Sequence, residues 1–184
     1  MTDIQLDSVG TSGPPAANLT EPGANVVVGI VNVADYQQRD FDSGELLTWD
    51  DGGPKMGKVV TGLVVSAEGT LCGNDSDAPF AQPGDLVSFW CEGGRHYTWR
   101  DAVRDANGAN VGDVMRWVRL EDEPPKKKGF NPRKVYEAKI RRPDPKDGDL
   151  ADRCVEKYHE LKDRPSVDAP ARDPFPAAAV HEDF

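Results

Sequence analysis

Cysteine is scarce in this chain of 184 residues, and its three cysteines form no recognisable pattern. Cys72, Cys91 and Cys154 are widely spaced, without CxxC or neighbouring histidine pairs. The sequence therefore predicts free thiols rather than a disulfide framework or a zinc site. Long apolar runs are also missing, and the N-terminus lacks a basic flank followed by an apolar stretch. We expect a soluble, cytoplasmic protein with no membrane partner.

Catalytic motifs are missing as well. The sequence contains no P-loop, GxSxG, HExxH or Cys/His pair with an orienting acid, and His96 stands alone before an amphipathic stretch. We therefore predict a protein that is not an enzyme and uses no cofactor. One acidic cluster leaves a calcium loop or a metal-dependent nuclease open as an alternative, although Gly44 comes too early for a calcium loop. Its members are Asp40, Asp42, Glu45, Asp50 and Asp51.

The composition divides the chain into one domain with appendages. Residues 1–24 are rich in Gly, Ser, Pro, Asn and Thr and predict a flexible leader. Residues 25–142 contain the clustered apolar residues of a core. Residues 143–165 predict a linker with a short helix, capped by Asp149, that docks either on the domain or on another subunit. Residues 166–184 predict a disordered acidic tail ending in Phe184.

The central segment alternates between strand patterns and one helix pattern. Val-rich strands are predicted at 25–33 and 57–66, each interrupted by a glycine that indicates a bend or bulge. A third strand is predicted at 84–93, a helix at 95–106, and two more strands at 111–121 and 133–140. Five strands with a helix between the third and fourth are typical of the OB-fold, a five-stranded Greek-key barrel. The predicted fold class is therefore all-β with one helix, plus the short C-terminal helix.

An OB-fold binds its ligand with the second and third strands and with the loops after strands one and four. These loops are "ADYQQRDFDSGELLTWDDGGPKM" and "EDEPPKKKGFNP", both long enough to suggest a function. Their aromatic and basic residues suit single-stranded nucleic acid, which is bound by base stacking and phosphate neutralisation. The candidates from the loops and their exits are Arg39, Phe41, Trp49, Lys55, Lys58, Lys126, Lys127, Lys128, Phe130, Arg133 and Lys134.

Aromatic and basic residues on the strands are more ambiguous, because the sequence does not fix which strand face is buried. Trp90, Trp117, Arg116 and Arg119 face either the barrel interior or the groove, and we expect at least one of the two tryptophans in the core. Trp90, Trp117 and Arg119 are kept as DNA-binding candidates. Tyr136 alternates in phase with Ala138 and Ile140 and is predicted to be structural. For Trp99 and Tyr97 on the helix, the sequence does not decide between packing and ligand binding.

The formal net charge of −10 is unevenly distributed. Residues 126–142 carry eight bases against the single acid Glu137. This basic stripe attracts polyanions, or it is a solvated charge run. The bases are Lys126, Lys127, Lys128, Arg133, Lys134, Lys139, Arg141 and Arg142.

Two blocks of sequence carry a family resemblance. The segments "QQRDFDSGELLTWDDGGPKMGKVVTGLVV" and "GDVMRWVRLEDEPPKKKGFNPRKVYEAKI" resemble the single-stranded DNA-binding proteins of actinobacteriophages, over about Val26 to Arg142. The resemblance implies an OB-fold that protects single strands during DNA replication, recombination and repair. It also implies a binding loop with Arg39, Phe41, Trp49 and Lys55, and a second with Lys128, Phe130 and Lys134. The alternative for "WDDGGPKM" is a rigid turn that holds Trp49 in the core.

The chain ends in "HEDF". Related single-stranded DNA-binding proteins are similar in ending with an acidic tip capped by Phe, which implies that Glu182, Asp183 and Phe184 recruit replication and recombination proteins. The edge strands of such an open barrel can pair between subunits, so the sequence also allows a homo-oligomer. The alternative function is an OB-fold that binds protein or duplex nucleic acid.

Overall fold

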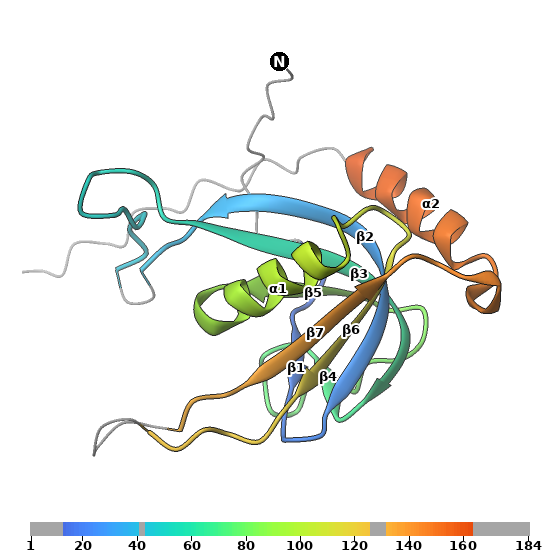
Figure 1. Cartoon of the computed structure of the whole chain (residues 1–184), viewed down its shortest axis with the longest axis horizontal. Helices are drawn as coiled ribbons and strands as arrows, with labels where there is room; N and C mark the ends of the chain where they lie inside the picture. Colours follow the sequence, from blue (N-terminus) through green and yellow to red (C-terminus); the bar gives the residue numbers. More distant parts are fainter. Residues whose placement is uncertain (1–12, 41–42, 126–131, 164–184) are drawn as a thin grey trace, which may run out of the picture.

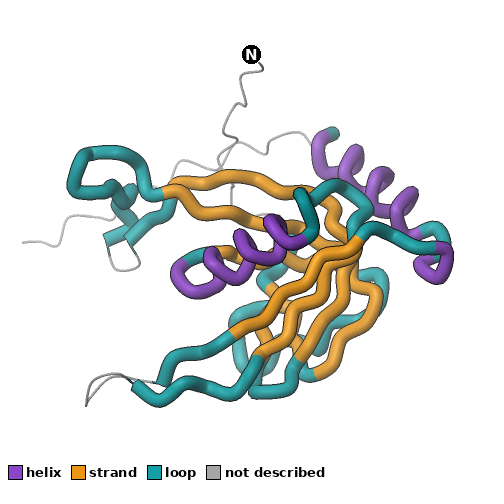
Figure 2. Tube along the Cα trace, viewed as in Figure 1, coloured by secondary structure: helices purple, strands orange, loops and turns teal. Residues whose placement is uncertain are grey.

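The computed structural model describes residues 13–40, 43–125 and 132–163, which form a β-sheet domain with two helices (Figures 1 and 2). The strands are β1 (Ala17–Leu19), β2 (Asn25–Gln37), β3 (Met56–Glu68), β4 (Thr70–Cys72), β5 (Leu86–Cys91), β6 (Val114–Arg119) and β7 (Tyr136–Arg141). The helices are α1 (Gly93–Asp105), the short 3-10 helix η1 (Pro145–Asp147) and α2 (Leu150–Lys162).

Five of the strands form one antiparallel sheet in the order β5-β3-β2-β6-β7. The predicted succession of three strands, a helix and two strands is confirmed by β2, β3, β5, α1, β6 and β7. The sheet is not closed, since its two edge strands, β5 and β7, are not paired with each other in the described part of the chain. Helix α1 packs against both edge strands and lies in front of the opening between them (Figure 1).

The long hairpin β2–β3 bends where the sequence predicts a bulge. Its register shifts between Val27 and Val28 and again between Ile30 and Asn32, on either side of Gly29. Strand β6 pairs with β2 only over Asn25–Gly29. Because bulges increase strand twist and curvature, the remainder of the hairpin diverges from β6 and projects from the sheet (Figure 1).

The core lies on the face of the sheet that α1 covers. Val26 and Val28 are buried here, whereas Asn25 and Val27, before and between them, are only partly buried, and the rings of Phe89 and Trp117 stack with centroids 5.8 Å apart. Trp99 on α1 is also buried there. The alternation puts one face of each strand into this core and leaves the other face for α2 or solvent.

Helix α2 docks on the opposite face of the sheet. Leu150 and Cys154 are buried and pack with Val31, Leu63 and Val114. Gly29 lies directly under this helix, where a Cβ atom would collide with the Cys154 thiol and with Leu150. Docking on the domain, one of the two predicted options, is therefore observed. Neither α1 nor α2, within the described ranges, combines the length and apolarity needed to cross a bilayer.

The predicted flexible leader, residues 1–24, requires a correction. Residues 1–12 lie outside the described ranges, but Ala17–Leu19 form β1, which pairs with β4. Ala17 and Leu19 are buried in the core cluster, and Pro15 accepts a backbone hydrogen bond of 2.8 Å from Ser88 on edge strand β5. Because these apolar residues gain a hydrophobic environment, the second half of the predicted leader is part of the domain.

Candidate nucleic-acid interface

Two long loops extend toward the same side of the molecule. The loop between β2 and β3 and the loop between β6 and β7 both reach to the left in Figure 1, with the first turn of α1 between them. Both begin where paired strands end, so the sheet fixes their bases and the distance between them.

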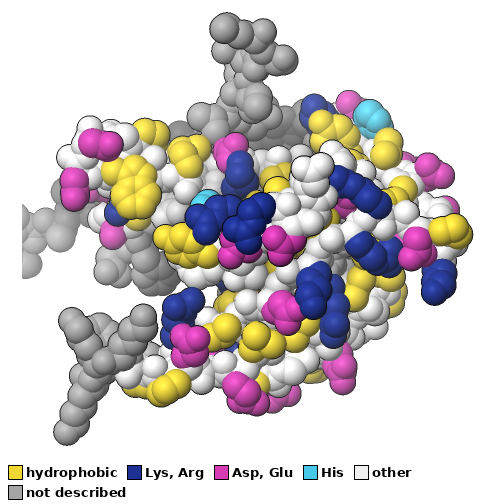
Figure 3. All heavy atoms as spheres, viewed as in Figure 1, with side chains coloured by type: hydrophobic (Ala, Val, Ile, Leu, Met, Phe, Trp, Pro, Cys, Tyr) yellow, Lys and Arg dark blue, Asp and Glu magenta, His cyan; other side chains and the backbone are white. Residues whose placement is uncertain are grey.

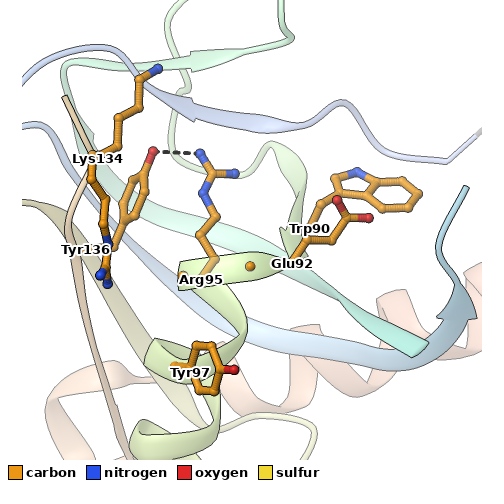
Figure 4. A pocket seen from close by; sticks show the side chains of 9 residues that line it. Trp90, Glu92, Arg95, Tyr97, Lys134 and Tyr136 are labelled. Carbon is orange, nitrogen blue, oxygen red and sulfur yellow. Dashed lines mark hydrogen bonds between the residues drawn. The ribbon is translucent and has the colours of Figure 1, made fainter. Parts of the chain in front are cut away.

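A cavity of about 700 Å³ lies where β5 passes into α1, next to the start of β7 (Figure 4). Its lining combines three aromatic side chains, three cations and one carboxylate with two glycines that open α1. The lining residues are Trp90, Glu92, Gly93, Gly94, Arg95, Tyr97, Arg133, Lys134 and Tyr136. We call this the first cavity.

Arg95 and Tyr136 are in direct contact in the wall of the first cavity. The Arg95 guanidinium lies 4.6 Å from the centroid of the Tyr136 ring and donates a 2.9 Å hydrogen bond to its hydroxyl. Behind them, Tyr136 meets Trp117 edge-on, with centroids 6.3 Å apart. Tyr136 is therefore structural, as predicted, and it also lines the cavity. The fixed arrangement orients a cation and a ring toward the same space.

Trp90 is fixed from the other side by Tyr36. Their rings are in edge contact with centroids 4.8 Å apart, and the Tyr36 hydroxyl donates to the carboxylate of Glu92. Burial, together with that carboxylate, raises the pKa of Tyr36 above its usual value of 10.0. Tyr36 reaches this position because it crosses Gly57 on β3, where a Cβ atom would lie 2.6 Å from the ring.

Trp49 lies on the first loop and is exposed, which makes the alternative of a core position wrong. It is 58% exposed, and the ammonium of Lys55 lies 4.9 Å from its ring centroid. A tight turn fixes it, since its backbone N–H donates to Gly53 over 2.7 Å. Arg39 is exposed and donates to the Gly44 carbonyl over 3.0 Å. The loop therefore offers a ring face and two cations to solvent.

Two predicted DNA contacts are wrong because the side chains are buried. Trp117 is 1% exposed and stacks on Phe89 in the core. Arg119 is 6% exposed and donates to the Leu19 and Thr20 carbonyls and to Asp122. Arg119 therefore holds the end of β1 and the turn that follows it, and it does not reach a ligand. Lys58 is partly exposed, but its ammonium is paired with Asp35 on the neighbouring strand.

The second loop is only partly described. Arg133 and Lys134 are exposed and line the first cavity, with the Arg133 guanidinium 3.9 Å from the Glu123 carboxylate. Eight residues of the predicted interface and tail lie outside the described residues. They are Phe41, Lys126 to Lys128, Phe130, Glu182, Asp183 and Phe184.

The described end of the basic stripe is largely neutralised. Arg141 bonds Asp147 at 2.6 and 2.7 Å, and this interaction lowers the pKa of Asp147 from 3.8 to about 2. Arg142 pairs with the buried Asp113 and donates to the carbonyls that end α1. A cation at a helix C-terminus is favourable there. These two arginines therefore stabilise the fold, and the stripe is not one uninterrupted cationic path.

Sequence reasoning missed Tyr36 and Arg95 and left Tyr97 open. Tyr97 is 57% exposed, with the Arg100 guanidinium 5.1 Å from its ring centroid. The available signal was the position of Arg95 and Tyr97, in the first turns of a helix that directly follows the third strand. These two positions identify functional candidates only when the start of this helix is known to face the second loop.

Metal chemistry finds no support in the described ranges, where no group of three His, Cys, Asp or Glu side chains could hold an ion. The described cysteines form no pairs, and burial raises the pKa of the Cys91 thiol to about 12 and that of Cys154 to about 11.

Comparison of the chain with protein-family models, curated proteins and solved structures finds no match. The function is therefore proposed from geometry and sequence.

Proposed function

We propose that this protein binds single-stranded DNA without sequence preference, through the first cavity and the exposed first loop. The observation that carries the proposal is the lining of the first cavity, which combines three aromatic side chains with three cations and only one acid. Single strands are bound by this combination, since bases stack on rings while cations neutralise the phosphates. The role is protection of strands exposed in DNA replication, recombination and repair, as the phage-protein resemblance implies.

The fold we propose is an OB-fold in its partly open form. The first four sheet strands in chain order, β2, β3, β5 and β6, have the spatial order β6-β2-β3-β5. This is the 4-1-2-3 order of a Greek key. The helix between the third and fourth of these strands and the long loops after the first and fourth also fit an OB-fold. The first cavity then lies at the third strand and the second loop, where such a fold binds its ligands.

Stacking supplies affinity in this proposal, and cations supply attraction. Each stacked base contributes about 1–3 kcal/mol, and Trp90, Tyr97 and the loop residue Trp49 offer partly or fully exposed rings. Arg95, Arg133 and Lys134 line the same cavity and suit phosphates. Glu92 opposes them, but its carboxylate already accepts the Tyr36 hydroxyl. A duplex is disfavoured because its bases already stack on one another and present no free ring faces.

The test is a tryptophan-fluorescence titration with oligo-dT and with a matched duplex at two salt concentrations. We expect quenching by the single strand alone, with log affinity falling linearly against log salt. Strong binding of the duplex, or of neither ligand, would contradict the proposal. The second result would favour the alternative of a protein-binding domain.

A matched pair of variants tests the site itself. Tyr97→Ala removes an exposed ring from the first cavity, and Phe80→Ala removes a similarly exposed ring outside it, 57% and 60% exposed respectively. Losing one stacked base corresponds to about 5–150-fold in affinity. We therefore expect that loss for Tyr97→Ala and less than about a twofold change for Phe80→Ala. Equal effects would remove the first cavity from the binding site.

Recruitment of replication or recombination proteins by Glu182, Asp183 and Phe184 is a separate proposal that rests on the sequence. A terminal ring fills an apolar pocket while neighbouring carboxylates meet basic residues at its rim. Deleting Phe184 should leave oligo-dT affinity nearly unchanged and abolish binding to a replication protein in a pull-down. Loss of both would contradict this division of roles.

A further inference from the structure

A second cavity, of about 520 Å³, lies at the far end of β7. It extends from the C-terminal half of α1 across β7 to β6 and β2, and Lys and Arg side chains gather over this region in Figure 3. Its floor is apolar and its rim is mostly basic. The lining residues are Val27, Ala102, Asp105, Val114, Arg116, Ala138, Lys139, Ile140 and Arg141.

Two cations of this rim face each other across neighbouring strands. Arg116 on β6 pairs in register with Lys139 on β7, and with Val27 on its other side. Directly opposite residues share a sheet face, and like charges in that position destabilise the pair. The Lys139 ammonium is 2.7 Å from the Glu137 carboxylate, and Lys139 and, more weakly, Arg116 lower the pKa of that carboxyl. One carboxylate thus acts on two cations, and a further anion between them would relieve the remaining repulsion.

The remaining charges of the rim are already compensated. Arg141 is bound by Asp147, and the acid Asp105 lies 3.4 Å from the Arg104 guanidinium. Arg116 and Lys139 share the single carboxylate of Glu137, so the second cavity keeps a net positive charge at this pair.

The two cavities follow one another along α1 and β7. The first is lined by Arg95 and Tyr136, at the starts of these elements, and the second by Ala102 and Ile140, near their ends. Six residues of β-strand span about 20 Å, so one extended polymer can reach both cavities. A ligand held in the first cavity is thereby directed toward the second.

We propose that a single DNA strand continues from the first cavity across β7 into the second, where Arg116 and Lys139 bind its phosphates above the apolar floor of Val27 and Val114. This inference rests on the proposed function and extends its binding path to the sheet face beyond the two loops. The succession of two cationic cavities along β7 favours a nucleic-acid strand over an acidic peptide, because a strand carries phosphates along its whole length.

The experiment compares the full-length protein with Arg116→Gln/Lys139→Gln. Oligo-dT of about 4 and about 16 nucleotides is used, because these are the limits of site size for one OB domain. The matched control is Arg153→Gln/Lys157→Gln, which removes the same charge from α2 outside both cavities. For the longer oligonucleotide we expect the first variant to lose affinity about tenfold. The slope of log affinity against log salt should fall by about 1.4, since each phosphate contact contributes about 0.7.

For the short oligonucleotide, which fits the first cavity alone, we expect wild-type affinity and slope in both variants. An unchanged slope with the long oligonucleotide, or the same loss with the control variant, would overturn the inference while leaving the proposed function intact. Wild-type protein that binds neither oligonucleotide would overturn both. Unchanged DNA binding with lost binding of an oligo-glutamate peptide would assign the second cavity to an acidic protein partner instead.

Discussion

Replacing Gly57 with Ala tests how the fold holds the candidate site in place. The Tyr36 ring crosses this glycine, and a Cβ atom there would lie 2.6 Å from its Cζ and 2.7 Å from its hydroxyl. Such contacts force the ring to move. Gly57 does not have a positive φ, so the backbone itself accepts alanine. We expect Tyr36 to leave the edge of Trp90 and to release Glu92, which loosens one wall of the first cavity.

The expected cost in stability is modest. Losing the aromatic pair costs about 0.5–1.5 kcal/mol, and losing one hydrogen bond costs about 1 kcal/mol. Replacing glycine by alanine returns about 0.4–1 kcal/mol, because the unfolded chain has less freedom. The free energy of unfolding should therefore fall by about 0.5–2 kcal/mol. The loss of oligo-dT affinity should be as large as that of one stacked base. This is about 1–3 kcal/mol, or about 5–150-fold.

Gly62→Ala on the same strand is the matched control. A Cβ atom at Gly62 would lie 2.6 Å from a methyl of Val28 in the core, away from the first cavity. Overpacking of this kind costs about 1–3 kcal/mol. Thermal unfolding should therefore give similar losses for both variants, whereas oligo-dT titration at a temperature where both are folded should show weakened binding only for Gly57→Ala. Equal affinities of the two variants would refute the proposed role of Tyr36.

Three further predictions concern other parts of the structure. Gly29→Ala should lower the free energy of unfolding by about 1–3 kcal/mol, because the added Cβ collides with the Cys154 thiol. Adding Cys154→Ala should recover part of this loss in a double-mutant cycle. Strict additivity of the two changes would contradict the packing of α2. The pKa of Asp147 is lowered from 3.8 to about 2, so its contribution to stability is complete above about pH 4 and is lost as the pH falls through 2. Asp147→Asn should therefore reduce the pH dependence of the free energy of unfolding, measured with urea, over this window. An unchanged pH profile would argue against the ion pair with Arg141. Trp49→Ala should leave the melting temperature unchanged because the ring is exposed, and it should weaken oligo-dT binding by about 5–150-fold; retained affinity would remove the first loop from the interface.

The order of elements was predictable from local sequence. Runs of β-branched residues such as Val26–Val28 and Val59–Val60 define strands whatever lies around them, because their preference is local. The end of α1 follows likewise from "NG" after it, whereas the helix begins at Gly93, two residues before the predicted start. The short strands β1 and β4 were missed, since three residues carry no periodic pattern and are stabilised by pairing with each other and by burial in the core.

The candidate site was only partly predictable, and Trp90 and Trp117 show why. Both occupy alternating strands with similar neighbours, yet Trp117 is 1% exposed while Trp90 lines the first cavity. Alternation tells which residues share a face, but the side on which α1 packs decides which face is buried. Arg119 follows the same rule, because its partners Leu19 and Thr20 come from a segment about a hundred residues away in the chain.

By itself the sequence determined the five strands of the main sheet, the two α-helices, the long loops and the chemical types gathered in them, because these depend on neighbours along the chain. The tertiary structure alone decided that Arg95, Trp90 and Tyr136 meet in one cavity, that Trp49 is exposed, and that Arg141 and Arg142 are neutralised by Asp147 and Asp113. The physical reason is that burial and charge compensation act through space over a few ångströms, and only packing of the sheet and α1 brings these distant residues within that range.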